Sequence, residues 1–93
     1  MATSAQRENR HPVTDERAVA ARFTETHLTV DLRDGRTIST PITWYPSLRN
    51  ASTEQRNNWR LIGSGIGIHW PDIDEDLSVE GMLDGRPAVS WDR

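Results

Sequence analysis

The 93-residue sequence lacks cysteine and lysine, and each absence excludes a class of protein. Without cysteine, the chain can form no disulfide scaffold, thiol nucleophile or cysteine-ligated metal site. Because its 11 basic residues are all arginine, it has no lysine for Schiff-base chemistry or for a phosphate-binding P-loop. No segment approaches the roughly 18 apolar residues of a membrane span, and no apolar signal segment follows the N-terminus. We therefore expect a small cytoplasmic protein.

Hydrophobic residues are also scarce, at 34% of the chain, and the mean hydropathy is −0.71. The length is that of one domain, so the core has to be small and the four tryptophans must fill much of it. Eleven arginines against 14 acidic residues give a net charge of −3. This mild acidity disfavours nonspecific nucleic-acid binding, which requires a cationic surface.

The distribution of apolar residues along the chain predicts one domain between two tails. Residues 1–15 hold too few apolar side chains to offset the entropy of ordering them, so we expect a disordered N-terminal arm. Residues 16–86 are expected to form a single α+β domain, and residues 87–93 a C-terminal tail.

Alternating side chains predict three antiparallel strands near residues 17–23, 28–32 and 37–42. In the first of them, Val19, Ala21 and Phe23 share one face. Register decides the loop between the second and third strands, because a slip of one residue turns every side chain to the other face. A three-residue loop over 33–35 sets Val30 opposite Ile38, whereas a two-residue loop would turn Ile38 to solvent. We therefore predict the longer loop, with Gly35 in the left-handed conformation of a G1 bulge.

The second half of the domain predicts short helices around another hairpin. Helical turns are expected over residues 44–50 and 53–58. The second of these begins with a capping box, in which Ser52 and Gln55 each bond the backbone of the other.

The remaining elements complete an α+β domain. Residues 59–62 and 66–70 are expected to form a hairpin that turns at the glycines of 63–65, and a last helix is expected over 77–84, ended by Gly85. The predicted order is β-β-β-(α)-β-β-α. The predicted architecture is one small antiparallel sheet of about five strands with two or three short helices.

The spacing of glycines, acids and other potentially reactive residues along the sequence does not predict an enzyme, a metal site or a cofactor site. The alternating glycines at 63–67 lack the third glycine and the following helix of a dinucleotide-binding loop. The alternating acids at 72–76 lack the glycine and the terminal carboxylate of an EF-hand. Ser64, His69 and Asp72 could be written as a triad, but such sets arise by chance in most sequences. We expect no catalytic, metal-binding or cofactor-binding residue.

Three arginines, Arg49, Arg56 and Arg60, cluster with asparagines and Trp59 in the helical segment. Arginine and asparagine beside an aromatic ring can stack on a nucleotide or bond to it. Nucleic-acid binding through residues 49–60 is therefore an alternative function. The same residues also fit a helix surface with Trp59 packed inward, and we favour this interpretation.

Three segments resemble a known bacterial family: residues 44–61, 67–72 and 75–81. They are similar to family 2442 of the domains of unknown function, and the resemblance extends over about residues 17–86. It implies an α+β fold without an agreed activity. It also implies a gene beside that of another short protein, in a layout resembling toxin–antitoxin modules. Some members carry a helix-turn-helix domain, which we do not expect here because only seven residues follow Arg86.

From these observations we expect a non-enzymatic protein-interaction module, the antitoxin-like or regulatory partner of a neighbouring small protein. The acidic segment 72–84 suits a basic partner. Tryptophans in excess of a small core, and open strand edges at 37–42 and 66–70, predict a homodimer or a complex with that partner. Residues predicted to contact a partner are Trp44, Tyr45, Arg49, Arg56, Trp70, Asp74, Glu75 and Asp76, with Trp44 and Tyr45 preferred to Trp59.

Overall fold

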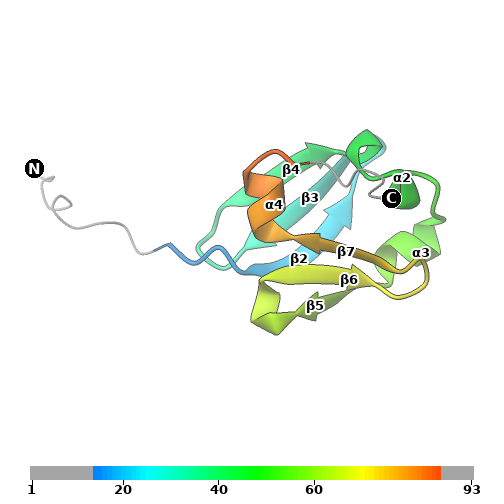
Figure 1. Cartoon of the computed structure of the whole chain (residues 1–93). Coiled ribbons are helices and arrows are strands. Elements are labelled where there is room, and N and C mark those ends of the chain that lie inside the picture. The colour runs from blue at the N-terminus through cyan, green and yellow to red at the C-terminus, as the bar shows by residue number, and fades with distance from the viewer. Residues whose placement is uncertain (1–13, 87–93) are drawn as a thin grey trace, which may run out of the picture.

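The computed structural model describes residues 14–86, which form a small α+β fold of two three-stranded antiparallel sheets (Figure 1). The first sheet has the order β2-β3-β4, and the second has the order β5-β6-β7. The α+β class is as predicted, whereas the single sheet of about five strands is wrong. The predicted tail at 87–93 and residues 1–13 of the predicted arm lie outside the described residues.

The first sheet contains β2 (Ala18–Phe23), β3 (His27–Leu32) and β4 (Thr37–Pro41). The predicted hairpin register is confirmed, because Val30 pairs with Ile38. The three-residue loop is closed by a hydrogen bond from the Leu32 N–H to the Arg36 carbonyl at 2.8 Å. Gly35 has a φ of +94°, the left-handed conformation that the bulge requires. The register of this hairpin is therefore determined by its own short loop and by the alternation of apolar side chains in β3.

A bulge in β2 overturns the predicted face of Val19. The pairing of β2 with β3 shifts between Ala18 and Ala20, so that an extra residue enters the strand there. Ala18 and Ala21 face the core, whereas the Val19 side chain is 45% exposed. Asp15, which lies in the predicted arm, accepts a hydrogen bond at its carbonyl from the Asp34 N–H at 3.2 Å.

Three short helical elements join the two sheets: η1 (Ile42–Trp44), α2 (Pro46–Arg49) and α3 (Thr53–Asn57). The predicted turn over 44–50 is thus divided between η1 and α2. The capping box of α3 is confirmed, because the Gln55 N–H donates to Ser52 Oγ at 3.1 Å and the Ser52 N–H donates to Gln55 Oε1 at 2.9 Å.

The second sheet contains β5 (Arg60–Ile62), β6 (Gly67–Trp70) and β7 (Glu75–Ser78), with η2 (Gly63–Gly65) between β5 and β6. Strand β7 was not predicted, because its only buried side chain, Leu77, sits among acidic and polar residues. It pairs with β6 and makes β6 the central strand, so the predicted open edge at 66–70 is wrong.

The last helix, α4 (Val79–Leu83), is shorter than the predicted 77–84 because β7 occupies the preceding residues. Ser78 caps it by accepting from the Gly81 N–H at 2.9 Å. Gly85 ends it with a φ of +73°, as predicted. No helix within residues 14–86 is both long and apolar enough to cross a membrane.

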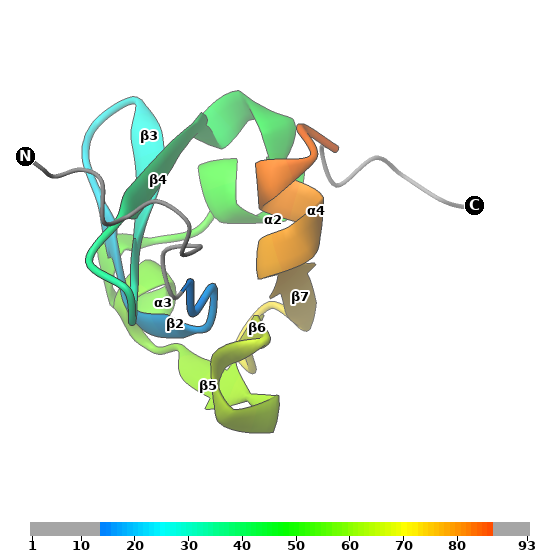
Figure 2. The same cartoon turned by 90° about the vertical axis from the view of Figure 1, so that its left-hand side faces the viewer.

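The core lies between the two sheets, which stand on opposite sides of the molecule in Figure 2. Trp70 from β6 is completely buried, and its indole N–H donates to the Arg56 carbonyl at 2.9 Å. The Phe23 ring meets Trp70 edge-on, with ring centroids 6.2 Å apart. Tyr45 is also completely buried and donates its hydroxyl to Thr40 Oγ1 at 2.9 Å. Aromatic side chains thus supply much of the volume of this small core.

Candidate functional site

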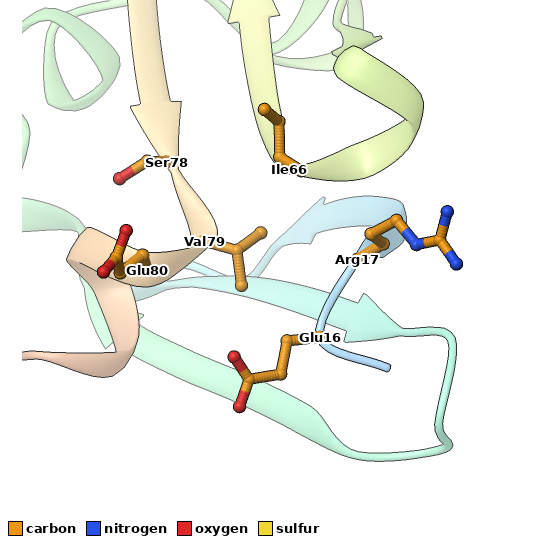
Figure 3. Close-up of a pocket in the computed structure, with 6 residues that line it drawn as sticks. All are labelled: Glu16, Arg17, Ile66, Ser78, Val79 and Glu80. Atoms are coloured by element: carbon orange, nitrogen blue, oxygen red, sulfur yellow. The ribbon is translucent and has the colours of Figure 1, made fainter. Parts of the chain in front are cut away.

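The candidate site is a pocket of about 400 Å³ at the seam between the two sheets, where the start of β2 approaches β6, β7 and α4 (Figure 3). We call it the seam pocket. It is lined by Glu16, Arg17, Ile66, Ser78, Val79 and Glu80.

Backbone contacts between distant segments fix the walls of the seam pocket. The Val79 N–H donates to the Ile66 carbonyl at 3.0 Å, which ties the start of α4 to the start of β6. The Arg33 N–H donates to the Arg17 carbonyl at 2.8 Å, which holds the segment before β2 against the first hairpin. Gly65 lets η2 approach β2 closely, because a Cβ there would collide with the backbone oxygen of Ala18.

Carboxylates and aliphatic carbons dominate the seam pocket. Ile66 is 62% exposed and provides apolar surface at the pocket, whereas Val79 is buried with 3% exposure at its base. The Glu80 carboxylate lies to one side of Val79 and the Glu16 carboxylate lies below it in Figure 3. Glu16 Oε2 is 3.4 Å from Arg36 Nη2. A pocket with this lining suits a side chain with an aliphatic stem and a cationic end.

The arginine of the seam pocket is already paired. The Arg17 guanidinium donates to the Asp15 carboxylate at 2.9 and 2.8 Å, and this hydrogen bonding lowers the pKa of Asp15 from 3.8 to about 2. In Figure 3 the Arg17 side chain points away from Glu16 and Glu80. Arg17 is therefore engaged with Asp15, and Glu16 has Arg36 as its cationic neighbour.

The turn between β6 and β7 adds further carboxylates on the second sheet. Asp74 and Asp76 are exposed, and Asp76 bonds to His69 Nδ1 across the strands. Glu75 points toward the core side, where burial raises the pKa of its carboxyl. Of these three predicted contact residues, Asp74 and Asp76 are thus exposed, whereas Glu75 is half-buried on the other face of β7 from Asp76.

Other predicted contact residues lie elsewhere. Tyr45 and Trp70 have no exposed surface, so the prediction that they touch a partner is wrong for the folded chain. The prediction assumes that a small core cannot hold many aromatic side chains, but the space between the two sheets holds both. Trp44 is partly buried, with its ring edge-on to Tyr45 at 6.4 Å, and Arg49 is exposed on α2.

Arg56 has a structural position that the sequence did not reveal. Its Nε donates to the Leu48 carbonyl at 2.8 Å and its Nη2 to the Arg49 carbonyl at 2.9 Å. The guanidinium also lies 5.6 Å from the centre of the Phe23 ring. It therefore caps the end of α2 with its charge and joins α3 to the first sheet. In the alternative nucleic-acid segment 49–60, Arg49 and Arg60 are exposed, whereas Arg56 is engaged in these contacts.

The residues written as a triad do not form one. His69 bonds to Asp76, whereas Asp72 accepts from Asn58 Nδ2 at 3.0 Å. Within residues 14–86, no group of three or more histidine and acidic side chains could hold a metal ion.

Sequence reasoning missed the seam pocket itself. In the sequence, Glu16 lies next to the predicted disordered arm, and the patterns around Ile66 and Val79 predict only a strand and a helix. Glu80 was part of the acidic segment 72–84. Only the spacing between two separate sheets brings these residues together, and no local pattern carries that information.

Comparison with known proteins supports the fold and adds no activity. Residues 18–88 match the sequence model of a family described as protein of unknown function (DUF2442). The structure resembles the crystal structure of a protein of unknown function from Rhodospirillum rubrum, with 33% identity, a TM-score of 0.69, and coverage of 81% of this chain and 94% of that one. An uncharacterized protein from Chromobacterium violaceum, solved by NMR, has the same TM-score at 22% identity over 94% of this chain and 77% of that one. No curated protein gives a significant match.

Proposed function

Because the chain belongs to the DUF2442 family of proteins of unknown function, whose description assigns no activity, we propose its function from the seam pocket and the surrounding charges. The chain is a non-enzymatic protein-interaction module, the antitoxin-like or regulatory partner of a small protein encoded nearby. That partner places a cationic side chain, arginine or lysine, in the seam pocket.

The segregation of charge between the two sheets carries this proposal. On the first sheet, arginines pair with neighbouring carboxylates, as in Arg22–Asp31 at 2.9 Å and Arg36–Asp34 at 2.9 Å. Between Arg60 and Arg86 the sequence has no arginine or lysine, but it has six acids: Asp72, Asp74, Glu75, Asp76, Glu80 and Asp84. The second sheet and α4 therefore carry the net negative charge, which attracts a basic partner and speeds its encounter.

The seam pocket gives that attraction a specific contact. The stem of an arginine or lysine would cover the carbons of Ile66, and its charged end would lie between Glu16 and Glu80. Charge-assisted hydrogen bonds to two carboxylates are stronger than neutral ones. The β6–β7 turn would then meet further basic residues of the same partner.

A peptide probe tests the pocket directly. The ¹⁵N-labelled full chain is titrated with a short peptide containing one arginine, and with the same peptide containing neutral citrulline. We expect amide shifts at Ile66, Val79 and Glu80 with the arginine peptide only. The double variant Glu16→Gln/Glu80→Gln should bind about tenfold more weakly or not at all, since it loses charged hydrogen-bond acceptors.

The control is Glu54→Gln, which removes an exposed carboxylate from α3 and should leave binding unchanged. An equal response to both peptides, or shifts confined to other residues, would contradict the pocket assignment.

Co-expression tests the partner itself. The product of the adjacent gene should co-purify with the wild-type chain and with Glu54→Gln, and co-expression should restore growth where that product is toxic. The Glu16→Gln/Glu80→Gln variant should lose the complex. No complex and no rescue, or binding to nucleic acid that falls steeply with salt, would contradict the proposed function.

A further inference from the structure

Strand β5 leaves one edge of the second sheet open. Within residues 14–86, β5 pairs only with β6, which lies between β5 and β7. In both Figure 1 and Figure 2, β5 is at the outer side of the fold. The backbone N–H and C=O groups along such an edge can pair with the strand of another chain.

The side chains of β5 expose apolar surface on both faces. Leu61 pairs with Ile68 and so faces the core side, whereas Ile62 pairs with Gly67 and faces outward. Their exposed fractions are 39% and 38%. Arg60 is the only arginine or acidic residue within residues 59–71. Sheet edges are commonly protected by several charges or by proline, and β5 has a single arginine.

From this edge we infer that β5 pairs antiparallel with β5 of a second copy, about a twofold axis through Leu61. The result is one six-stranded sheet in the order β7-β6-β5-β5-β6-β7. In this register Leu61 lies opposite the partner's Leu61, and Arg60 lies opposite the partner's Ile62 on the outward face. The arginine stem covers the isoleucine, and no like charges stand directly opposite one another.

Charge favours a second copy at this edge. The acidic residues of the second sheet, Asp72, Asp74, Glu75 and Asp76, lie on β7 and the β6–β7 turn, so pairing through β5 sends the two acidic regions to opposite ends of the joined sheet. Pairing through β7 would bring them together. The surface is self-complementary, as a twofold interface must be.

The size of the interface sets the expected strength. Three paired residues bury less than the roughly 1,600 Å² of a standard interface, so the dimer is weak and forms at high protein concentration. This inference goes beyond the proposed function, because Leu61 and Ile62 do not line the seam pocket.

Sedimentation equilibrium of the full chain, from about 10 µM to about 1 mM, should show a reversible monomer–dimer exchange. Ile62→Arg places two arginines opposite one another at two symmetric positions and should weaken the dimer about tenfold. Ile62→Glu places a carboxylate opposite each Arg60 and should retain or strengthen it. The contrast tests the register, because both variants replace the same exposed isoleucine with a charged residue.

Leu83→Arg, on the exposed side of α4, is the matched control and should leave the dimer unchanged. Thermal unfolding of each variant confirms that the fold is intact. The seam-pocket variant Glu16→Gln/Glu80→Gln should still dimerise, so failure of one proposal is distinguishable from failure of the other. A monomer at every concentration, or equal weakening by Ile62→Arg and Ile62→Glu, would overturn the strand pairing.

Discussion

Arg56 is the residue whose role changed most between sequence and structure. Its guanidinium bonds two carbonyls at the end of α2 and lies over Phe23. We expect Arg56→Ala to lower the free energy of unfolding by about 1–3 kcal/mol, because hydrogen bonds to a charged group are lost. Arg56→Lys should recover only part of this, since an ammonium cannot reproduce the two-pronged geometry.

Urea denaturation measures the Arg56 effect. Arg49→Ala, an exposed arginine on the neighbouring helix, should change stability by less than about 0.5 kcal/mol. Equal stability of Arg56→Ala and wild type would contradict the structural role of Arg56. It would then favour the alternative in which Arg56 contacts nucleic acid.

At the scale of elements, the junction between η2 and β2 holds the two sheets together at one point. Gly65 combines a φ of +108° with backbone contact to Ala18, whereas Gly35 has a φ of +94° and open space around it. Gly35→Ala should cost about 1–2 kcal/mol for the left-handed conformation alone. Gly65→Ala should cost that amount plus about 1–3 kcal/mol of overpacking.

The comparison of these two glycine variants by thermal or urea unfolding separates the conformation from the close contact. The Gly65→Ala chain should also lose binding at the seam pocket, because η2 carries Ile66 at its end. If the two variants were equally stable, the close approach of η2 to β2 would be contradicted.

At the scale of the whole molecule, the two sheets respond to pH in opposite directions. Hydrogen bonds from Arg17 and Arg36 lower the pKa of Asp15 and Asp34 from 3.8 to about 2. Their contribution to stability is therefore complete above pH 3.8 and is lost as the pH falls to about 2. Burial raises the pKa of Glu75 above 4.5, so its contribution falls as the pH rises through 4.5.

Thermal unfolding against pH should consequently show a loss of Tm below pH 3.8, and a gain on acidification toward pH 4.5 that depends on Glu75. Glu75→Gln should raise Tm at pH 7 and remove that gain, while Glu25→Gln, exposed beside β2, should do neither. A Tm gain that survives in Glu75→Gln would show that another group is responsible.

The sequence by itself determined the elements that close on themselves over a few residues. The hairpin of β3 and β4 follows from one alternating strand and a glycine at the bulge, and the start of α3 follows from Ser52 and Gln55. These features depend on neighbours along the chain, so their pattern is visible without the fold. The family resemblance and the α+β class were predicted in the same way.

Only the tertiary structure decided the rest. Strand β7 exists because Leu77 packs beside Ile68, although two of its four residues are acidic. The division into two sheets buries Tyr45 and Trp70 between them, so these aromatics are core residues and not contact residues. The seam pocket joins residues 16 and 17 to residues 66–80, and such long-range proximity is fixed by packing between sheets, which leaves no signature in a local pattern.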